Sequence, residues 1–140
     1  MIAVVRIRGS VNVKKDIKDT LKMLRLKRVN HCVLVPKNEN YAGMLKKVES
    51  YVTYGEISLD VLEKLILKRG RVMNKKLNQS EAKKVANKIM QEKSLKNLGL
   101  NPVFRLSPPS KGHKKIRKQY PKGALGHRSG NINELLKRMI

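Results

Sequence analysis

Apolar residues recur along the first 58 positions with two spacings, one typical of strands and one typical of helices. Residues 1–9, 29–35 and 52–57 are rich in β-branched side chains, and each run predicts a strand. Residues 12–27 and 40–51 place apolar side chains three or four positions apart, which predicts helices. The order is therefore β-α-β-α-β. Because each crossover helix must return across the sheet, we expect both helices on one face of a small sheet.

The first predicted strand has two unlike sides. One side is apolar throughout, whereas the other begins apolar and ends with Arg6 and Arg8. Because successive side chains of a strand point to opposite faces, we expect one apolar face and one face that turns cationic toward the end of the strand.

Helical spacing continues in the second half of the chain. Ser58 is placed to cap a helix that Gly70 ends, and residues 80–93 predict another helix. A short strand at 103–106 precedes a basic loop, and Asn131 with Glu134 resembles a capping box at the start of a last helix. The predicted fold class is α+β in a single domain. It has three parts: a β-α-β-α-β core at 1–58, a helical insertion at 59–101, and a strand, basic loop and C-terminal helix at 102–140.

Charge changes this picture, because Lys and Arg outnumber Asp and Glu by 33 to 10 and the formal net charge is +23. Such a chain repels itself, and a polyanion is its natural partner. No acidic residue lies between Glu92 and Glu134, and residues 104–128 alone contain eight Lys and Arg. That segment has too little apolar surface to offset the entropy of its ordering, so we expect it to order on an anionic partner. The alternative is a solvated basic tail that contacts nothing.

The sequence lacks the features of membrane-spanning, secreted, disulfide-bonded and metal-binding proteins. No apolar run approaches the roughly 20 residues of a membrane-spanning helix, and no signal peptide opens the chain, so we expect a soluble cytoplasmic protein. The single cysteine, Cys32, lies in an apolar run and is expected to be a buried structural thiol. His31, His113 and His127 lack zinc-site spacing, and we expect neither a metal nor a cofactor.

Catalytic groups are scarce, and we expect no enzyme. The ten acids lie mostly on predicted helix faces beside lysines. His113 and His127 flank the basic loop, which leaves open an RNA-processing enzyme that uses them as acid and base on a ribose hydroxyl. Hydrogen bonding to phosphate or ribose explains these histidines equally well. A general nucleic-acid-binding protein of the chromatin type is a further alternative.

The basic loop contains glycines, prolines and one aromatic residue, Tyr120. Glycine at Gly112 or Gly123 allows close approach to an RNA backbone, although each glycine equally suits a merely flexible loop. Tyr120 fits stacking on a base and local packing equally well. Since aromatic residues are sparse elsewhere, we expect recognition by phosphate contacts and shape.

Several motifs resemble one known family, the large-subunit ribosomal protein "thirty" family. Its signature spacing is matched at Thr20-Leu21, Leu24, Leu26, Arg28, His31 and Val33, and again at Met44-Leu45, Val48 and Tyr51-Val52. The runs Val29–Pro36, Tyr54-Gly-Glu56, Lys68-Arg-Gly70, Arg105–Pro109 and Gly112-His113 are similar to the long archaeal and eukaryotic-type members. The least matched part is residues 72–98. The resemblance therefore spans essentially the whole chain.

This resemblance implies a fold and a function. It implies a three-stranded antiparallel sheet, an extended C-terminal portion, and a structural role in the large ribosomal subunit on the ribosome in the cytoplasm. The implied partners are large-subunit ribosomal RNA and neighbouring ribosomal proteins. Family members place the turn before the second strand against RNA, which here means Arg28, Asn30 and His31. Together with the basic segments, the expected rRNA-binding residues are Arg28, Asn30, His31, Arg69, Arg71, Lys75, Lys76, Arg105, Lys111, His113, Lys114, Lys115, Arg117, Lys118, Lys122, His127 and Arg128.

Overall fold

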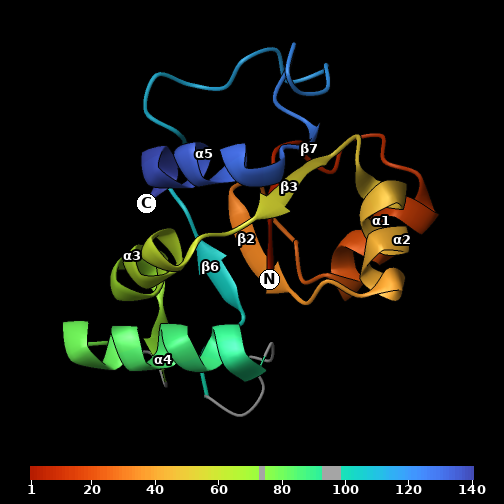
Figure 1. The fold of residues 1–140 in the computed structure, drawn as a ribbon. Coiled ribbons are helices and arrows are strands. Elements are labelled where there is room, and N and C mark those ends of the chain that lie inside the picture. The colour runs from red at the N-terminus through yellow and green to blue at the C-terminus, as the bar shows by residue number, and fades with distance from the viewer. Residues whose placement is uncertain (73–74, 93–98) are drawn as a thin grey trace.

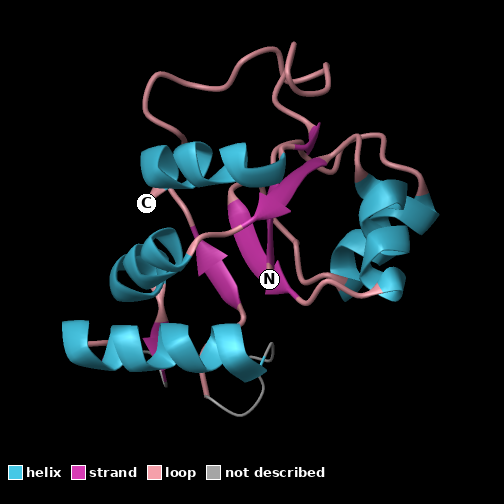
Figure 2. Cartoon of the chain, viewed as in Figure 1, coloured by secondary structure: helices cyan, strands magenta, loops and turns pink. Residues whose placement is uncertain are grey.

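A five-stranded sheet separates two layers of helices (Figure 1). The structure is a computed structural model that describes residues 1–72, 75–92 and 99–140. The strands of this sheet are β1 (Ile2–Arg6), β2 (His31–Val35), β3 (Val52–Glu56), β6 (Val103–Arg105) and β7 (Gly126–His127). The helices are α1 (Lys15–Met23), α2 (Glu39–Val48), α3 (Leu59–Arg69), α4 (Gln79–Glu92) and α5 (Ile132–Met139), with a 3-10 turn η2 (Ser129–Asn131) before α5. A hairpin of β4 (Arg71–Val72) and β5 (Lys75–Lys76) joins α3 to α4 (Figure 2).

Strand β1 is the centre of the sheet, whose strand order is β6-β2-β1-β3-β7. It pairs antiparallel with both neighbours, so that Val4 lies between Val33 and Tyr54. The predicted α+β class and its three antiparallel strands are confirmed. The C-terminal segment widens this core at both edges, with β6 antiparallel to β2 and β7 parallel to β3.

Helices α1 and α2 cover one face of the sheet, as predicted. Both helices are amphipathic, and their apolar stripes meet the side chains that alternate strand residues point toward them. The buried cluster on this face consists of Val4, Leu21, Leu24, Leu26, Val33, Val35, Leu45, Val48 and Val52.

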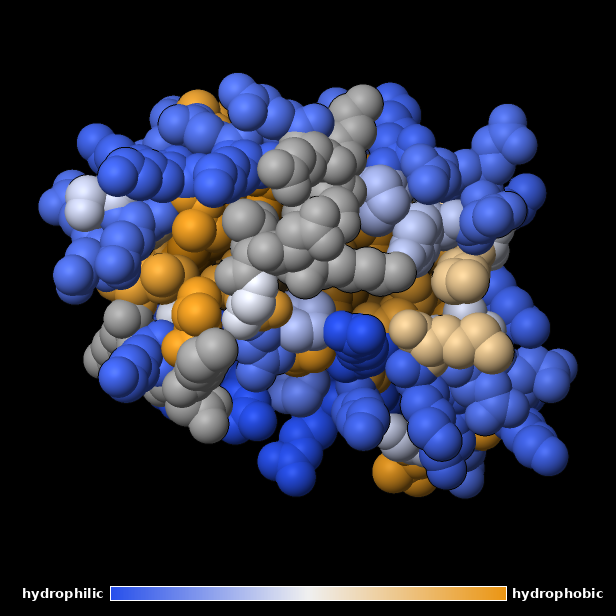
Figure 3. Space-filling view, turned by 90° about the horizontal axis from the view of Figure 1, so that it is seen from below, coloured by the Kyte–Doolittle hydropathy of each residue, from blue (hydrophilic) through white to orange (hydrophobic). Residues whose placement is uncertain are grey.

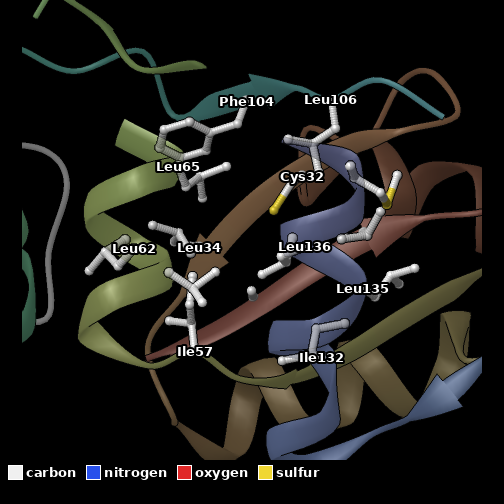
Figure 4. Packing of buried hydrophobic residues seen from close by; sticks show 14 of the residues in the cluster. Cys32, Leu34, Ile57, Leu62, Leu65, Phe104, Leu106, Ile132, Leu135 and Leu136 are labelled. Atoms are coloured by element: carbon white, nitrogen blue, oxygen red, sulfur yellow. The ribbon is translucent and has the colours of Figure 1, made fainter. Parts of the chain in front are cut away.

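The other face is covered by the second half of the chain. Figure 4 shows residues of α3, α5 and β6 meeting over the sheet. Phe104 of β6 is fully buried beside Leu65, and Leu136 of α5 lies over the central strands. Helix α4 packs outside α3 and adds Ala86 and Ile89 to the same cluster. Cys32 is buried in this cluster, and burial raises the pKa of its thiol to about 12, as a structural thiol requires.

Because helices cover both faces, β1 differs from its prediction. Ala3, Val4 and Val5 are all fully buried, and Arg6 is only 3% exposed. The expected cationic face therefore starts beyond Arg6, at Arg8, which is half-buried two residues past the end of the strand. Periodicity within one strand could not reveal the second layer, because that layer comes from residues more than fifty positions away.

The sequence signals mark where α3 and α5 begin, but neither predicted N-cap side chain caps its helix. Ser58 stands at the N-cap of α3 and Gly70 at its C-cap, while the Ser58 hydroxyl donates to Asn133 Oδ1 at 3.3 Å. Asn131 stands at the N-cap of α5, but its side chain caps nothing; instead its amide donates a hydrogen bond to the hydroxyl of Tyr120 at 2.6 Å. Asn131, the first residue of the predicted capping box, therefore connects the start of α5 to the basic loop.

Gly55 is the point where α5 approaches the sheet most closely. It lies in β3, and a Cβ atom there would overlap the carbonyl oxygen of Ser129 and crowd the side chain of Ile132. The absence of a side chain lets η2 and α5 rest directly on β3. Gly43 offers a contrast, since it is exposed in α2 and a Cβ there would contact nothing within 4 Å.

We expect Gly55→Ala to destabilise the protein by roughly 1–3 kcal/mol, because overpacking must push α5 away from β3. The matched control Gly43→Ala is expected to stabilise it by about 0.5–1 kcal/mol, since alanine is the better helix former. Chemical denaturation of both variants measures these changes. Equal stability of Gly55→Ala and wild type would contradict the close packing.

Candidate nucleic-acid interface

A cationic groove of about 530 Å³ lies between the end of α1 and the edge strand β6. Four cations line it together with one histidine, and no acidic side chain takes part. Its lining residues are Lys22, Arg25, Lys27, His31, Asn101, Pro102, Val103 and Arg105. We call this the cationic groove.

The floor of the cationic groove follows from strand alternation. His31 of β2 pairs with Arg105 of β6, and Cys32 pairs with Phe104. Cys32 and Phe104 point into the cluster under α3 and α5, so His31 and Arg105 point to the opposite face, beside α1. Strand β6 lies outside β2, and its α1-side face therefore becomes the floor of a groove.

The wall of the groove is the end of α1. The amide of Leu26 donates to the carbonyl of Leu21, and the amide of Arg25 donates to that of Lys22, both at 2.9 Å. This pattern is a Schellman motif, and Arg25 holds its left-handed position with φ of 60°. Glycine is the usual residue there, and an arginine costs about 1 kcal/mol. The strained position carries a guanidinium into the groove.

The turn from α1 to β2 also presents the residues that the resemblance singled out. Asn30 has φ of 63°, and its amide donates to the carbonyl of Arg6 at 2.8 Å. Among the described residues, Asn30 Oδ1 and His31 Nδ1 are buried without a hydrogen-bond partner. Burial lowers the pKa of His31, and Arg105, Arg28 and Arg6 lower it further. The positive charge of the groove thus comes from its lysines and arginines.

Residues 107–125, which we call the basic strap, form a closed structure that is anchored on α5. Arg138 donates hydrogen bonds to the carbonyls of Ser110 and Gly112, both at 2.6 Å. At the far end, Ala124 and Leu125 are buried in the core. This differs from the expectation that the segment lacks the apolar surface to order by itself. Ala124 and Leu125 attach its end to the core, and hydrogen bonds from Arg138 and Arg128 hold the rest.

The strap folds back on itself through backbone hydrogen bonds. The amide of Tyr120 donates to the carbonyl of Leu125 at 2.8 Å, and the amide of Ala124 donates to that of Lys115 at 3.1 Å. A Cβ at Gly123 would overlap the carbonyl oxygen of Lys118, so this glycine is required by the fold of the strap itself. The tip exposes an acid-free run around a hollow of about 540 Å³ formed by His113, Lys114, Lys115, Ile116, Arg117 and Lys118.

Three residues that the sequence assigned to RNA make side-chain contacts within the molecule, although His127 remains exposed. Arg128 donates to the hydroxyl of Thr53 at 2.9 Å and lies over the ring of Tyr120, so Tyr120 packs locally. Arg69 donates to the hydroxyl of Ser107 and to the C-terminal residue. His127 packs its ring against that of Tyr54. Arg69 and Arg128 thus help to hold the two ends of the strap in place.

The hairpin of β4 and β5 adjoins the cationic groove. The amide of Asn101 donates to the carbonyl of Arg71 at 3.0 Å, which joins the hairpin to one end of the groove. Arg71 and Lys75 are exposed there. The side chain of Lys76 lies outside the described part of the structure. Of the remaining predicted residues, Arg28, Lys111 and Lys122 are exposed on the turn and the strap.

Sequence reasoning missed the groove wall formed by Lys22, Arg25 and Lys27. A signal was present, because these cations end the helix that leads into the turn already assigned to RNA. Charge alone could not select them, since hydrophilic residues are spread around the rim of the face shown in Figure 3. Among the described side chains the only ion pair joins Lys37 and Glu56, at 3.0 Å on the surface. The cations of the groove and the strap therefore have no carboxylate partners within the described structure.

The fold and this surface define a class of protein: a small α+β protein with two groups of cations that have no acidic neighbours in the part of the chain that the structure describes. One group lines the cationic groove, and the other lies on the basic strap. No helix in the described residues is long and apolar enough to cross a membrane. The family profile described as ribosomal protein L30p/L7e matches residues 2–52. That range covers β1, α1, β2 and α2, and thus half of the groove.

Whole-chain relatives extend the match to the C-terminus. A Methanococcus maripaludis protein named large ribosomal subunit protein uL30 is 51% identical over 99% of this chain and 98% of its own length. Proteins of the same name from Archaeoglobus fulgidus and Methanosphaera stadtmanae are 46% and 43% identical, over at least 99% of both chains. The chain therefore belongs to the ribosomal protein L30p/L7e family, and the resemblance to its long archaeal members is confirmed.

Stability should depend on the protonation of His113. Burial lowers the pKa of His113, and Arg128 and Arg138 lower it further. A histidine whose pKa is lowered by folding stabilises the protein fully above its unfolded pKa of about 6.5, and that stability is lost as the pH falls through the folded pKa. We expect His113→Gln to lose less stability than wild type between about pH 7.5 and about pH 5.5. Denaturation at both pH values tests this, and equal losses would contradict it.

Amide exchange should divide the strap into two parts when no RNA is present. The amides of Tyr120, Leu125 and Arg128 donate to backbone carbonyls and should be protected. Residues 114–117, whose amides donate to no backbone carbonyl in the described structure, should exchange fast. Hydrogen exchange read residue by residue measures this. Fast exchange throughout 107–128 would contradict the closed strap.

Proposed function

We propose that this protein is a structural constituent of the large ribosomal subunit and that it binds large-subunit rRNA. The observation that carries the proposal is the cationic groove, in which four Lys and Arg side chains converge and no acid lines the walls. Phosphate is a ligand that such a group of cations can bind. The names of the archaeal relatives support the large ribosomal subunit as the assembly that supplies it.

Two surfaces divide the binding in this proposal. The cationic groove binds the RNA backbone through Lys22, Arg25 and Arg105, and the neighbouring hairpin extends this contact. The tip of the basic strap binds a second stretch of RNA through its exposed lysines. Because Arg138, Arg128 and Gly123 hold the strap closed, little entropy is lost when the RNA arrives. The core of residues 1–58 docks, and neighbouring ribosomal proteins complete the site on the cytoplasmic ribosome.

The alternatives receive less support. An RNA-processing enzyme would need His113 and His127 to act on one ribose, but they have different surroundings: His113 lies near Arg128 and Arg138, whereas His127 packs on Tyr54. A chromatin-type protein would bind duplex DNA as tightly as rRNA. Competition between the two nucleic acids at equal salt concentration separates these classes.

Salt dependence tests the proposal directly. We expect the double variant Lys22→Gln/Arg105→Gln to bind rRNA more weakly, with a log-log salt slope shallower by about 1.4–1.8, since each lost phosphate contact changes the slope by about 0.7–0.9. The matched control is Lys84→Gln/Lys88→Gln, which removes the same charge from the exposed side of α4. Filter binding over a range of salt concentrations measures both slopes. Equal effects of the two variants, or a flat slope in wild type, would contradict groove binding.

A further inference from the structure

Arg6 is a buried arginine that hydrogen-bonds only to uncharged groups in the described structure. Its side chain is 3% exposed, and its Nη1 donates to the carbonyls of Leu26 and Lys27 at 2.7 and 3.0 Å. Its Nε donates to the carbonyl of Arg8 at 2.8 Å, and its Nη2 donates to the hydroxyl of Ser10 at 2.7 Å. Four hydrogen bonds from one guanidinium thus reach two separate segments of the chain.

Through these contacts, Arg6 joins two loops at the end of β1. The acceptors Leu26 and Lys27 belong to the turn that follows α1, whereas Arg8 and Ser10 belong to the loop that follows β1. The backbone of Arg6 adds a further tie, because its carbonyl accepts the amide of Asn30 at 2.8 Å. The turn between Leu26 and Asn30 is therefore bound to Arg6 at both of its ends.

A buried cation without a carboxylate partner is costly, and burial lowers the pKa of Arg6. A neutral side chain could fill the same core position without that cost. What the guanidinium supplies is geometry, since its planar fork can satisfy several carbonyls that converge from different directions. A lysine offers donors at a single point and cannot span them.

We propose that Arg6 is the positioning residue of the cationic groove: it holds the turn that carries Arg25, Lys27 and Arg28 in the arrangement that RNA meets. This inference rests on the proposed function. Arg6 itself is buried and does not contact RNA. Its effect is to order the turn before binding, so that the cost of ordering does not reduce the affinity.

The test separates position from charge with Arg6→Lys, which keeps the charge but loses the fork. We expect rRNA affinity to fall by about tenfold, the cost of re-ordering a few side chains on binding, with the salt slope unchanged. Exchange at the amides of Leu26 and Asn30 should accelerate, while the amide of Arg128, which follows β7, stays protected. The matched control is Arg8→Lys, a neighbouring arginine that lies over Tyr51 and donates to the carbonyl of Ser50. It should bind as wild type does.

A milder variant covers the case in which Arg6→Lys fails to fold. Ser10→Ala removes one acceptor of the guanidinium and should weaken binding by about twofold to threefold, with faster exchange at Leu26. Unchanged affinity and unchanged exchange in a folded Arg6→Lys or in Ser10→Ala would overturn the inference. If wild type itself does not bind rRNA, the proposed function fails, whereas the exchange rates at Leu26 and Asn30 still decide whether Arg6 holds the turn.

Discussion

The structure depends on the burial of β1 on both faces. A strand enclosed in this way must find hydrogen-bond partners on both edges and apolar neighbours above and below. Strands β2 and β3 supply the edges, α1 with α2 supplies one layer, and α3 with α5 supplies the other. Because β1 ends inside this enclosure, the side chain of Arg6 cannot reach bulk water. It turns instead to the carbonyls of the loops that surround the end of the sheet.

The basic segment from 103 to 128 is part of this enclosure as well as part of the basic surface. It begins with β6 and ends just after β7, and α5 then closes the second face across Gly55. The strap between them is held by arginines, so the same residue type that carries the net charge also fastens the chain. Arg138 donates to backbone carbonyls, and Arg128 donates to the carbonyl of Ala124 and the hydroxyl of Thr53. The charges at the tip of the strap make no such contacts with the described residues and are available to a partner.

The cationic groove is composite. Lys22, Arg25 and Lys27 belong to the residues matched by the family profile, whereas Asn101 and Arg105 come from the C-terminal part shared with the long archaeal relatives. Neither half forms a groove alone, since α1 provides a wall and β6 provides the floor. In the proposed function, strand β6 therefore enlarges the RNA-binding surface of the core.

Local pattern was sufficient to determine the α+β class, the β-α-β-α-β order, the shared face of α1 and α2, the structural role of Cys32, and the family. Each of these depends on periodicity or on motifs a few residues apart. Tertiary structure decided which cations face outward. In the sequence, nothing distinguishes Arg6, Arg69 and Arg128 from Arg25 or Arg105. In the structure, the first three donate to carbonyls and hydroxyls of distant segments. A charge count cannot distinguish the two groups, because the acceptors that capture an arginine lie far from it in the sequence.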